Sequence, residues 1–310
     1  MNRKQKNMKK ISSKEFEKFF GSFNDKQLIN EIKKDNLKYR FLNYIEKKKI
    51  INFIKRNHKH IKNKKAGVRY KNIWENGWKE NLILYKKKKS ISSLLPKYFG
   101  KNNYARIGTK LIKVNNSKFE PKILKHLMSY IFKKYLKNFR TIVEFGCGTG
   151  HHLLNLKKYN KKSTIYGLDW AKSSQQIINS FTKKNIIGKN FNFFKPKIDF
   201  ALEKNGWASY TVASLEQVGN KYIPFVNFLI KKKPKIVIHI EPIVELHEHN
   251  NELEQLSIQY IKKRNYLNGY LNYLKNLEKK KIIKIIKTRR SYFGSLFING
   301  YSLIIWKILN

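Results

Sequence analysis

Three glycines, Gly146, Gly148 and Gly150, alternate with other residues directly after a short apolar run that begins at Thr141. Such a run, followed by glycines and then by a helical pattern from His151, predicts a strand, a tight turn and the start of a helix. Glycine suits this turn because the backbone angles are costly for other residues, and because a ligand resting on the loop leaves no room for a Cβ. We therefore expect the loop to contact a ligand.

Two carboxylates near this loop indicate the kind of ligand. Glu144 stands two residues before the first glycine, where it would repel a pyrophosphate but attract an ammonium group. The G-x-G-x-G spacing also differs from the G-x-G-x-x-G of dinucleotide sites. Asp169 ends a second β-like run 19 residues after Gly150, where it can accept hydrogen bonds from ribose hydroxyls. Adenosine joined to an amino acid, as in S-adenosylmethionine, satisfies both acids.

From about Phe119 to the C-terminus, the sequence resembles the class I S-adenosylmethionine-dependent methyltransferases. The segment from Glu144 to Gly150, EFGCGTG, matches the first motif of that family, and Asp169 matches its ribose-binding acid. An ordinary strand-to-helix turn, or a helix N-cap in the case of Asp169, is the alternative. The resemblance implies that S-adenosyl-L-methionine is the cofactor. The residues expected to bind it are Glu144, Gly146, Cys147, Gly148, Thr149, Gly150, Asp169 and Trp170.

Segments of helical and of β-strand pattern alternate from Phe119 onward. This order predicts an α/β fold, a doubly wound, seven-stranded, mostly parallel sheet of Rossmann-like type that ends in a hairpin. We expect a methyltransferase domain over residues 119–310, with its ligands beyond the C-terminal ends of the strands. A single long helix is expected over residues 253–280. The predicted strands cover residues 141–146, 163–170, 190–194, 208–218, 235–242, 281–288 and 301–308.

Methyl transfer to a hydroxyl requires a group that accepts the proton of the acceptor. The chain has only 20 acidic residues, and two of them, Glu216 and Glu241, lie at or near the C-terminal ends of the fourth and fifth predicted strands. His239 lies two residues before Glu241, on the same face of its strand. We therefore expect Glu216, His239 and Glu241 to be the catalytic candidates, and the sequence does not rank them.

A group of acidic and histidine residues follows Glu241. It would hold substrate hydroxyls or amines, supply a base or bind a divalent ion. Alternatively, its acids suit the start of a helix, whose dipole attracts negative charge. The His-x-His spacing supplies no third ligand, so no metal site is predicted. The group consists of Glu245, His247, Glu248, His249, Glu252 and Glu254.

Residues 1–118 are predicted to form a basic, helical N-terminal unit. Apolar residues recur at helical intervals between Leu28 and Ile50, with lysines on the other faces. An aromatic block follows, which is typical of a core but is also placed to cover the ligand cleft as a lid or substrate cap. Arg106 is expected to hold a carboxylate of the cofactor or of a substrate. The block contains Trp74, Trp78, Pro96, Tyr98, Phe99 and Tyr104.

The formal net charge is +48, with 59 lysines and nine arginines. Lysine occurs together with abundant Asn, Ile, Phe and Tyr, so a bias toward A and T in the codons accounts for much of this charge. A dedicated nucleic-acid surface would favour arginine, and we expect only nonspecific binding to polyanions. Cys147 is the single cysteine, which excludes an internal disulfide. Since no apolar run reaches membrane-spanning length, a cytoplasmic protein is expected, and the oligomeric state is not indicated.

Three functions agree with these patterns. The first is transfer of a methyl group to an oxygen or nitrogen of a small molecule, since SLEQ, IHIEP and SYFGSLF resemble methyltransferases of sugar or surface-polysaccharide biosynthesis. The second is an RNA methyltransferase whose basic N-terminal unit grips the strand. The third is a noncatalytic scaffold that has kept the fold. Methylation of DNA bases is not expected, because the fourth strand leads into ASLEQ rather than N/D-P-P-Y and no second cysteine is present.

Overall fold

A seven-stranded sheet forms the centre of the computed structural model, which describes residues 8–61, 67, 70–204 and 206–309. Its strand order is β10-β12-β9-β8-β5-β6-β7. The five strands from β5 to β9 run parallel, and β12 is antiparallel to both β9 and β10. The predicted mostly parallel sheet with a C-terminal hairpin is therefore confirmed. The strands are β5 (Thr141–Phe145), β6 (Thr164–Asp169), β7 (Ile186–Asn190), β8 (Trp207–Val212), β9 (Ile236–Glu241), β10 (Ile283–Arg289) and β12 (Ser302–Ile308).

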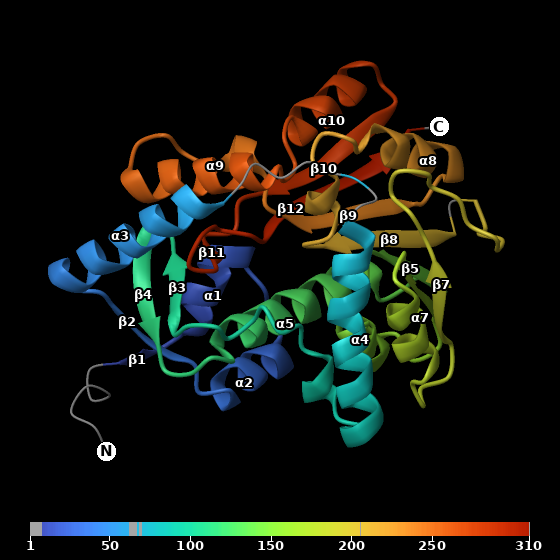
Figure 1. Cartoon of the computed structure of the whole chain (residues 1–310). Helices are drawn as coiled ribbons and strands as arrows, with labels where there is room; N and C mark the ends of the chain where they lie inside the picture. Colours follow the sequence, from blue (N-terminus) through green and yellow to red (C-terminus); the bar gives the residue numbers. More distant parts are fainter. Residues whose placement is uncertain (1–7, 62–66, 68–69, 205, 310) are drawn as a thin grey trace.

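Helices cover both faces of this sheet, because successive strand residues point to opposite sides. Ile142 of β5 packs in one hydrophobic cluster with α5 and α6, whereas its neighbour Val143 packs in a second cluster with α8 and α10. Figure 1 shows α8 and α10 on one side of the sheet and α5 on the other. The helices are α5 (Phe119–Ile131), α6 (His151–Tyr159), α7 (Lys172–Asn179), α8 (Ile223–Lys232), α9 (Glu252–Arg264) and α10 (Tyr270–Lys279).

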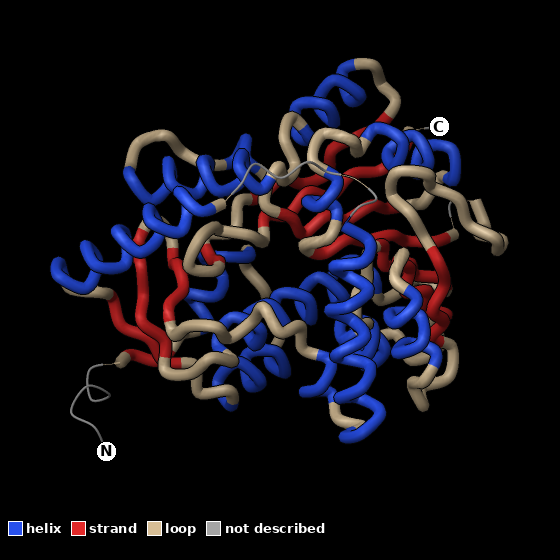
Figure 2. Tube along the Cα trace, in the orientation of Figure 1, coloured by secondary structure: helices blue, strands red, loops and turns tan. Residues whose placement is uncertain are grey.

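The segment before residue 118 contains strands as well as the predicted helices. Its strands form a second, antiparallel sheet of order β1-β2-β4-β3-β11, in which β11 comes from the connection between β10 and β12. Figure 2 shows the strands of the two sheets as separate groups with helices between them. The prediction of a purely helical unit was wrong here, because pairing between distant short strands leaves little trace in local periodicity. The positions 1–7, 62–66 and 68–69 of that unit lie outside the described residues.

The elements of this segment pack directly against the seven-stranded sheet. Phe16, Leu28 and Tyr39 belong to the same hydrophobic cluster as Ile142 and Tyr210. Among the described residues, no helix is long and apolar enough to cross a membrane. The elements are β1 (Lys9–Lys10), α1 (Ser13–Phe20), α2 (Lys26–Lys34), β2 (Lys38–Phe41), α3 (Tyr44–His60), α4 (Lys71–Lys88), β3 (Tyr104–Ile107), β4 (Lys110–Val114) and β11 (Phe293–Gly294).

Three predicted boundaries differ from the structure. The third strand is β7, which ends at Asn190, so the stretch 191–194 is a loop rather than a strand. The fourth strand ends at Val212, and the SLEQ segment forms the 3₁₀ helix η5 (Leu215–Val218). The predicted long helix is broken into α9 and α10, because Asn265 adopts φ 51° and Gly269 adopts φ 76°, left-handed conformations that end a helix.

Candidate active site

The glycine loop follows β5 and turns sharply into α6. Gly146, Gly148 and Gly150 have φ of 70°, 53° and 72°, a region that favours glycine. A Cβ on Gly146 would lie 2.5 Å from Cβ of Ser214, and one on Gly148 would lie 2.8 Å from Cζ2 of Trp78. Side chains of the protein thus approach the loop closely from two sides, and contact between the loop and a ligand stays a prediction.

A cavity of about 910 Å³ begins at this loop and extends toward the second sheet. Seven of the eight residues expected to bind the cofactor line it, namely Glu144, Gly146, Cys147, Gly148, Thr149, Asp169 and Trp170. Gly150 does not line it. A Cβ on Gly150 would lie 2.7 Å from Cγ1 of Ile178, so this glycine allows α6 to pack closely against α7.

Glu144 is a buried carboxyl group at the end of β5. Tyr210 Oη donates a hydrogen bond of 2.8 Å to its Oε2. Burial raises the pKa of Glu144 to about 8, and the nearby Asp169 carboxylate adds to the rise, although the Tyr210 bond opposes it. A cationic group entering the cavity would restore the ionised form, so the site is suited to an ammonium ligand.

Asp169 connects the end of β6 to the glycine loop. Its Oδ2 accepts a hydrogen bond of 2.9 Å from the Gly148 N–H, and its Oδ1 accepts one of 2.9 Å from the Ala171 N–H. Burial raises the pKa of Asp169 to about 6, while these two backbone donors oppose the rise. Each oxygen retains a lone pair that can accept a bond from a ligand hydroxyl.

Aromatic side chains surround the loop. Trp170, Phe193 and Phe194 line the cavity beside Asp169, and the rings of Trp170 and Phe194 lie 6.0 Å apart. They follow β6 and β7, at the strand ends where an α/β sheet binds its ligands. Their faces are available for a planar base.

Helix α4 packs against α7 (Figure 1), and its Trp78 lies against Gly148 of the glycine loop. Trp74 and Trp78 stack with ring centroids 5.4 Å apart and line the cavity. The Glu75 carboxylate accepts hydrogen bonds of 2.6 Å and 3.0 Å from the N–H groups of Lys172 and Ser173 at the start of α7. These bonds fix α4 against the N-terminus of α7, where an acidic side chain also satisfies unpaired N–H groups. A role for α4 as a lid stays a prediction.

Only Glu216 of the three catalytic candidates lines the cavity. It lies in η5, and Gln217 Nε2 donates a hydrogen bond of 2.7 Å to its Oε1. His239 is fully buried in β9, with Nδ1 2.9 Å from Thr211 Oγ1 and Nε2 2.7 Å from Tyr270 Oη. Burial lowers the pKa of His239 to about 3, so this ring serves the interior of the fold and the geometry does not support it as the base.

Glu241 is also withdrawn from the cavity. Its carboxylate accepts hydrogen bonds from the N–H groups of Ser214, Leu215 and Glu216, at 3.2, 3.1 and 3.1 Å. Burial raises the pKa of Glu241 to about 7 against the effect of these donors. Glu241 therefore holds η5, and with it Glu216, in place, and the geometry gives it a positioning role rather than that of a base.

The acidic group after Glu241 is engaged in structural contacts. Glu254 pairs with Arg290 Nη2 at 2.5 Å and with His247 Nδ1 at 3.1 Å. Glu248 also pairs with Arg290, Glu245 accepts a bond from the Leu271 N–H, and Glu252 pairs with Lys55. None of these side chains lines the cavity, and no group of three or more potential ligands that could hold a metal ion is found within the part of the chain that the structure describes.

Arg106 has a role that differs from the predicted one. Its buried guanidinium donates to the carbonyl oxygens of Leu296, at 2.8 Å, and Leu253, at 2.9 Å, and also to Ser257 Oγ. It therefore ties β3 to α9 and to the loop after β11 rather than holding a carboxylate. An arginine in a strand gives no local signal of such distant carbonyl partners.

Glu120 is a cavity residue that sequence reasoning missed. It lies in the first turn of α5, and Tyr301 Oη donates a hydrogen bond of 2.8 Å to its Oε1. Burial raises the pKa of Glu120 to about 7, although the Tyr301 bond opposes the rise. An acid in a first helical turn is ordinarily explained by the helix dipole, and its partner lies 181 residues away, so no spacing in the sequence marks it.

A scan against protein-family models and a search of curated proteins each gave no match. Solved structures do match over about 60% of the chain. One is an O-methyltransferase of neocarzinostatin biosynthesis, at 14% identity and TM-score 0.43, covering 60% of this chain and 56% of that one. A second is a SAM-dependent methyltransferase from Aquifex aeolicus, at 15% identity and TM-score 0.40, covering 57% of this chain and 89% of that one. A third is human N-acetylserotonin methyltransferase, at 14% identity and TM-score 0.43, covering 61% of this chain and 55% of that one. The chain thus spans little more than half of the first and third of these proteins.

The sheet itself gives the structural classification. Its order places β5 at the centre, with β6 and β7 on one side and β8 and β9 on the other, and inserts the antiparallel β12 between β9 and β10. The glycine loop follows the central strand, and an acid ends the strand beside it. From Phe119 onward, the chain has the doubly wound, mostly parallel, Rossmann-like fold that the sequence predicts.

Proposed function

We propose that this protein is an S-adenosylmethionine-dependent methyltransferase that transfers a methyl group to an oxygen or nitrogen of a small molecule. The observation that carries the proposal is one continuous cavity. It is lined by the glycine loop with Glu144 and Asp169, and also by Glu216, Glu120 and several aromatic side chains. A cofactor and an acceptor can therefore meet inside it.

The residues at the loop end fit the chemical groups of S-adenosylmethionine. Glu144 is a buried carboxyl group that an ammonium would ionise, and Asp169 offers acceptors to the two hydroxyls of a ribose. Phe193, Phe194 and Trp170 offer aromatic faces to an adenine. The glycines allow close approach to the backbone. These residues would hold the cofactor, with α4 covering the loop.

Bound S-adenosylmethionine supplies an electrophilic methyl group on a sulfonium. The protein must then hold the acceptor atom in line with that methyl, accept a proton from it and keep water out. Glu216 is the proposed proton acceptor, since it lines the cavity and Glu241 fixes the backbone around it. Glu120, with its pKa near 7, is the second carboxyl group able to orient a hydroxyl or amine there.

The walls of the acceptor end favour a small molecule over RNA. Lys101 and Arg264 are the only lysine and arginine among the described residues that line the cavity, in a chain with a net charge of +48. An RNA-gripping surface would place a series of cations at this entrance. Tyrosine and phenylalanine faces interspersed with carboxyl groups instead suit a compact polar acceptor. We propose a sugar or surface-polysaccharide precursor as the specific substrate class.

The test combines binding with methyl transfer. Calorimetry with S-adenosylhomocysteine should show binding, and label from methyl-labelled cofactor should enter the small-molecule fraction of a cell extract. Label that disappears on RNase treatment would favour an RNA substrate, and absence of binding would refute the proposed function altogether.

Glu216→Gln provides the site-directed arm of this test. It should abolish labelling while leaving affinity for S-adenosylhomocysteine unchanged. Asp199→Asn serves as the control because Asp199 is an exposed acid paired only with Lys189 in the part of the chain described. Full labelling by Glu216→Gln would exclude Glu216 as the proton acceptor.

A further inference from the structure

Arg264 ends helix α9 and lines the same cavity as the glycine loop and Glu216. Its side chain is half-buried. Tyr260, one helical turn earlier, fixes the guanidinium: Arg264 Nε donates a hydrogen bond of 3.2 Å to Tyr260 Oη, and the guanidinium carbon lies 5.4 Å from the Tyr260 ring centroid. The group is thus held in one orientation by stacking and by a bond to its inner nitrogen.

The two outer nitrogens of this guanidinium have no hydrogen-bond or ion-pair partner among the residues that the structure describes. The arginines at other half-buried or buried positions use at least one outer nitrogen in a bond, although Nη2 of Arg106 and the Nε atoms of Arg289 and Arg290 have no partner in the described chain. Arg40 pairs with Glu46, Arg290 with Glu254, and Arg289 donates to backbone carbonyls. A guanidinium fork that is held in place and left open matches the two oxygens of a carboxylate or phosphate.

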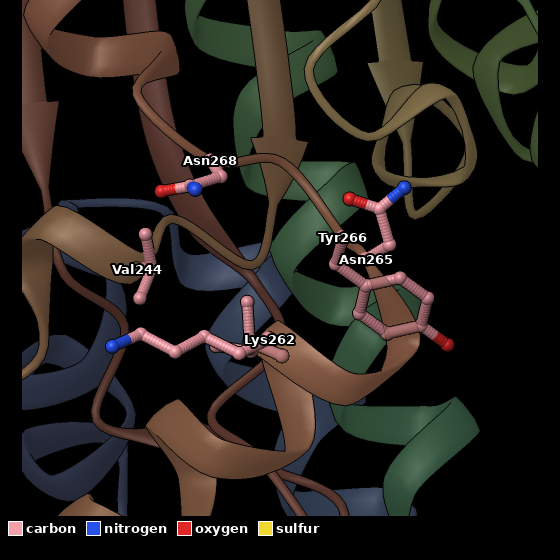
Figure 3. Close-up of a pocket in the computed structure, with 6 residues that line it drawn as sticks. Val244, Lys262, Asn265, Tyr266 and Asn268 are labelled. Atoms are coloured by element: carbon pink, nitrogen blue, oxygen red, sulfur yellow. The ribbon is translucent and has the colours of Figure 1, made fainter. Parts of the chain in front are cut away.

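A structural explanation for Arg264 is the helix dipole, which favours cations in a last helical turn. Lys262 and Lys263 already occupy that turn, and Lys263 Nζ donates to the carbonyl oxygen of His58 at 2.6 Å. Figure 3 shows Lys262 and Tyr266 pointing in opposite directions from the end of α9, and Tyr266 is also part of the cavity wall. Other cations therefore already interact with the helix dipole, and the dipole does not explain why Arg264 lines the cavity.

Arg264 and Glu216, the proposed proton acceptor, line the same cavity. Burial alone would lower the pKa of Arg264, but Tyr260, Tyr266 and Glu216 together raise it. The guanidinium therefore stays charged throughout the working pH range. Glu216 is near enough to act on it, yet no carboxylate lies within 4 Å of it in the described chain. An acceptor could bridge the two side chains.

We infer that Arg264, held by Tyr260, anchors an acidic group of the methyl acceptor, so that the substrate is a small molecule carrying a carboxylate or a phosphate. Its nucleophilic hydroxyl or amine would then lie toward Glu216. This inference rests on the proposed function and narrows its substrate class. It also assigns Arg264 a role in specificity that is separate from cofactor binding.

The test measures the charge of the product. A small-molecule extract of the source cells is separated into anionic, neutral and cationic fractions, and each is incubated with the protein and methyl-labelled cofactor. The labelled product should come from the anionic fraction and bind an anion exchanger. Loss of that binding after phosphatase treatment identifies a phosphate monoester, and its persistence identifies a carboxylate or a phosphodiester.

Variants of Arg264 then connect the charge to this side chain. The rate of methyl transfer is measured over a dilution series of the active fraction. Arg264→Gln should raise the amount of this fraction that gives half the maximal rate by about 10- to 100-fold, with little change in the maximal rate itself. Arg264→Lys keeps the helix-terminal charge but loses the fork, and should give an intermediate rise. Lys262→Gln removes a charge from the same turn and should have no effect. All three should bind S-adenosylhomocysteine like the unmodified protein, which also shows that they fold.

Two results would overturn the inference while leaving the proposed function intact: a labelled product that is neutral or cationic, or a half-saturating amount that Arg264→Gln does not change. A third result, no labelled product from any fraction although S-adenosylhomocysteine binds, would overturn the proposed function and this inference with it.

Discussion

The protonation of Glu144 should make cofactor binding strongly dependent on pH. Burial holds the pKa of Glu144 at about 8 in the ligand-free protein, whereas the ammonium group of the cofactor would stabilise the carboxylate. Binding at neutral pH therefore requires the loss of a proton, and affinity should rise as the pH rises toward 8. The perturbation is a change of pH from 6 to 8, compared between the unmodified protein and Glu144→Gln.

The expected magnitude follows from the ionised fraction of Glu144. With a pKa of about 8, about 1% of this group is ionised at pH 6 and about half at pH 8, so affinity should rise about 50-fold, or about 2.3 kcal/mol. Asp169, with a pKa of about 6, adds about twofold over the same interval. Glu144→Gln should bind weakly and retain only this smaller dependence.

The assay is calorimetry with S-adenosylhomocysteine at three pH values, in buffers of different ionisation enthalpy. At pH 7 the unmodified protein should release about one proton per ligand bound, and at pH 6 about 1.5, because Asp169 then contributes about half a proton. An affinity that does not change with pH, or a Glu144→Gln variant that keeps the full dependence, would refute the assigned role of Glu144.

Thermal unfolding of the ligand-free proteins provides the folding control. The pKa of Glu144 is raised from 4.5 in the unfolded chain to about 8, so the stability due to the protonated group is complete below pH 4.5 and is lost as the pH rises toward 8. Glu144→Gln should therefore match the unmodified protein at low pH and unfold at a higher temperature at pH 8.

Two further substitutions test the loop and its support. Gly148→Ala should lower affinity for S-adenosylhomocysteine at least about 10-fold, because the new Cβ would meet Trp78 at 2.8 Å and the left-handed backbone costs about 1 kcal/mol. Gly77→Ala is the control, since no atom lies within 4 Å of its Cβ, and it should leave this affinity unchanged. Equal binding by both variants would contradict the prediction. Glu241→Gln should lower the free energy of unfolding by about 1–3 kcal/mol, because it weakens three backbone hydrogen bonds. Urea denaturation measures it, and full stability with lost activity would instead indicate a catalytic role for Glu241.

The sequence predicts the large sheet and its glycine loop because both depend on local patterns. The apolar run before Gly146 and the acid at Asp169 are readable from composition and spacing alone. The catalytic residues are harder to predict from the sequence. His239 and Glu241 lie near strand ends as Glu216 does, but their side chains bond to groups in the protein interior. Which side of a strand end faces the cavity depends on the helices packed around it.

The second sheet and the acceptor wall depend on contacts between distant parts of the chain. Phe293 pairs with Ile107 in the small sheet, and Glu120 pairs with Tyr301. Neither pair produces a period within a window of 10 to 20 residues, which is all that amphipathic patterning can detect. The open guanidinium of Arg264 is likewise visible only once its neighbours are placed.

The strand β11 has a consequence for the order in which the protein matures on the ribosome. The small sheet is otherwise built from residues before 115, yet its last strand, at Phe293–Gly294, follows the strands β5 to β10 of the large sheet in the sequence. Domains that fold during translation usually use the N-terminal portion first. Here the early portion must wait for a later strand to cover its edge, so the small sheet is complete only after residues 119–292 have been made.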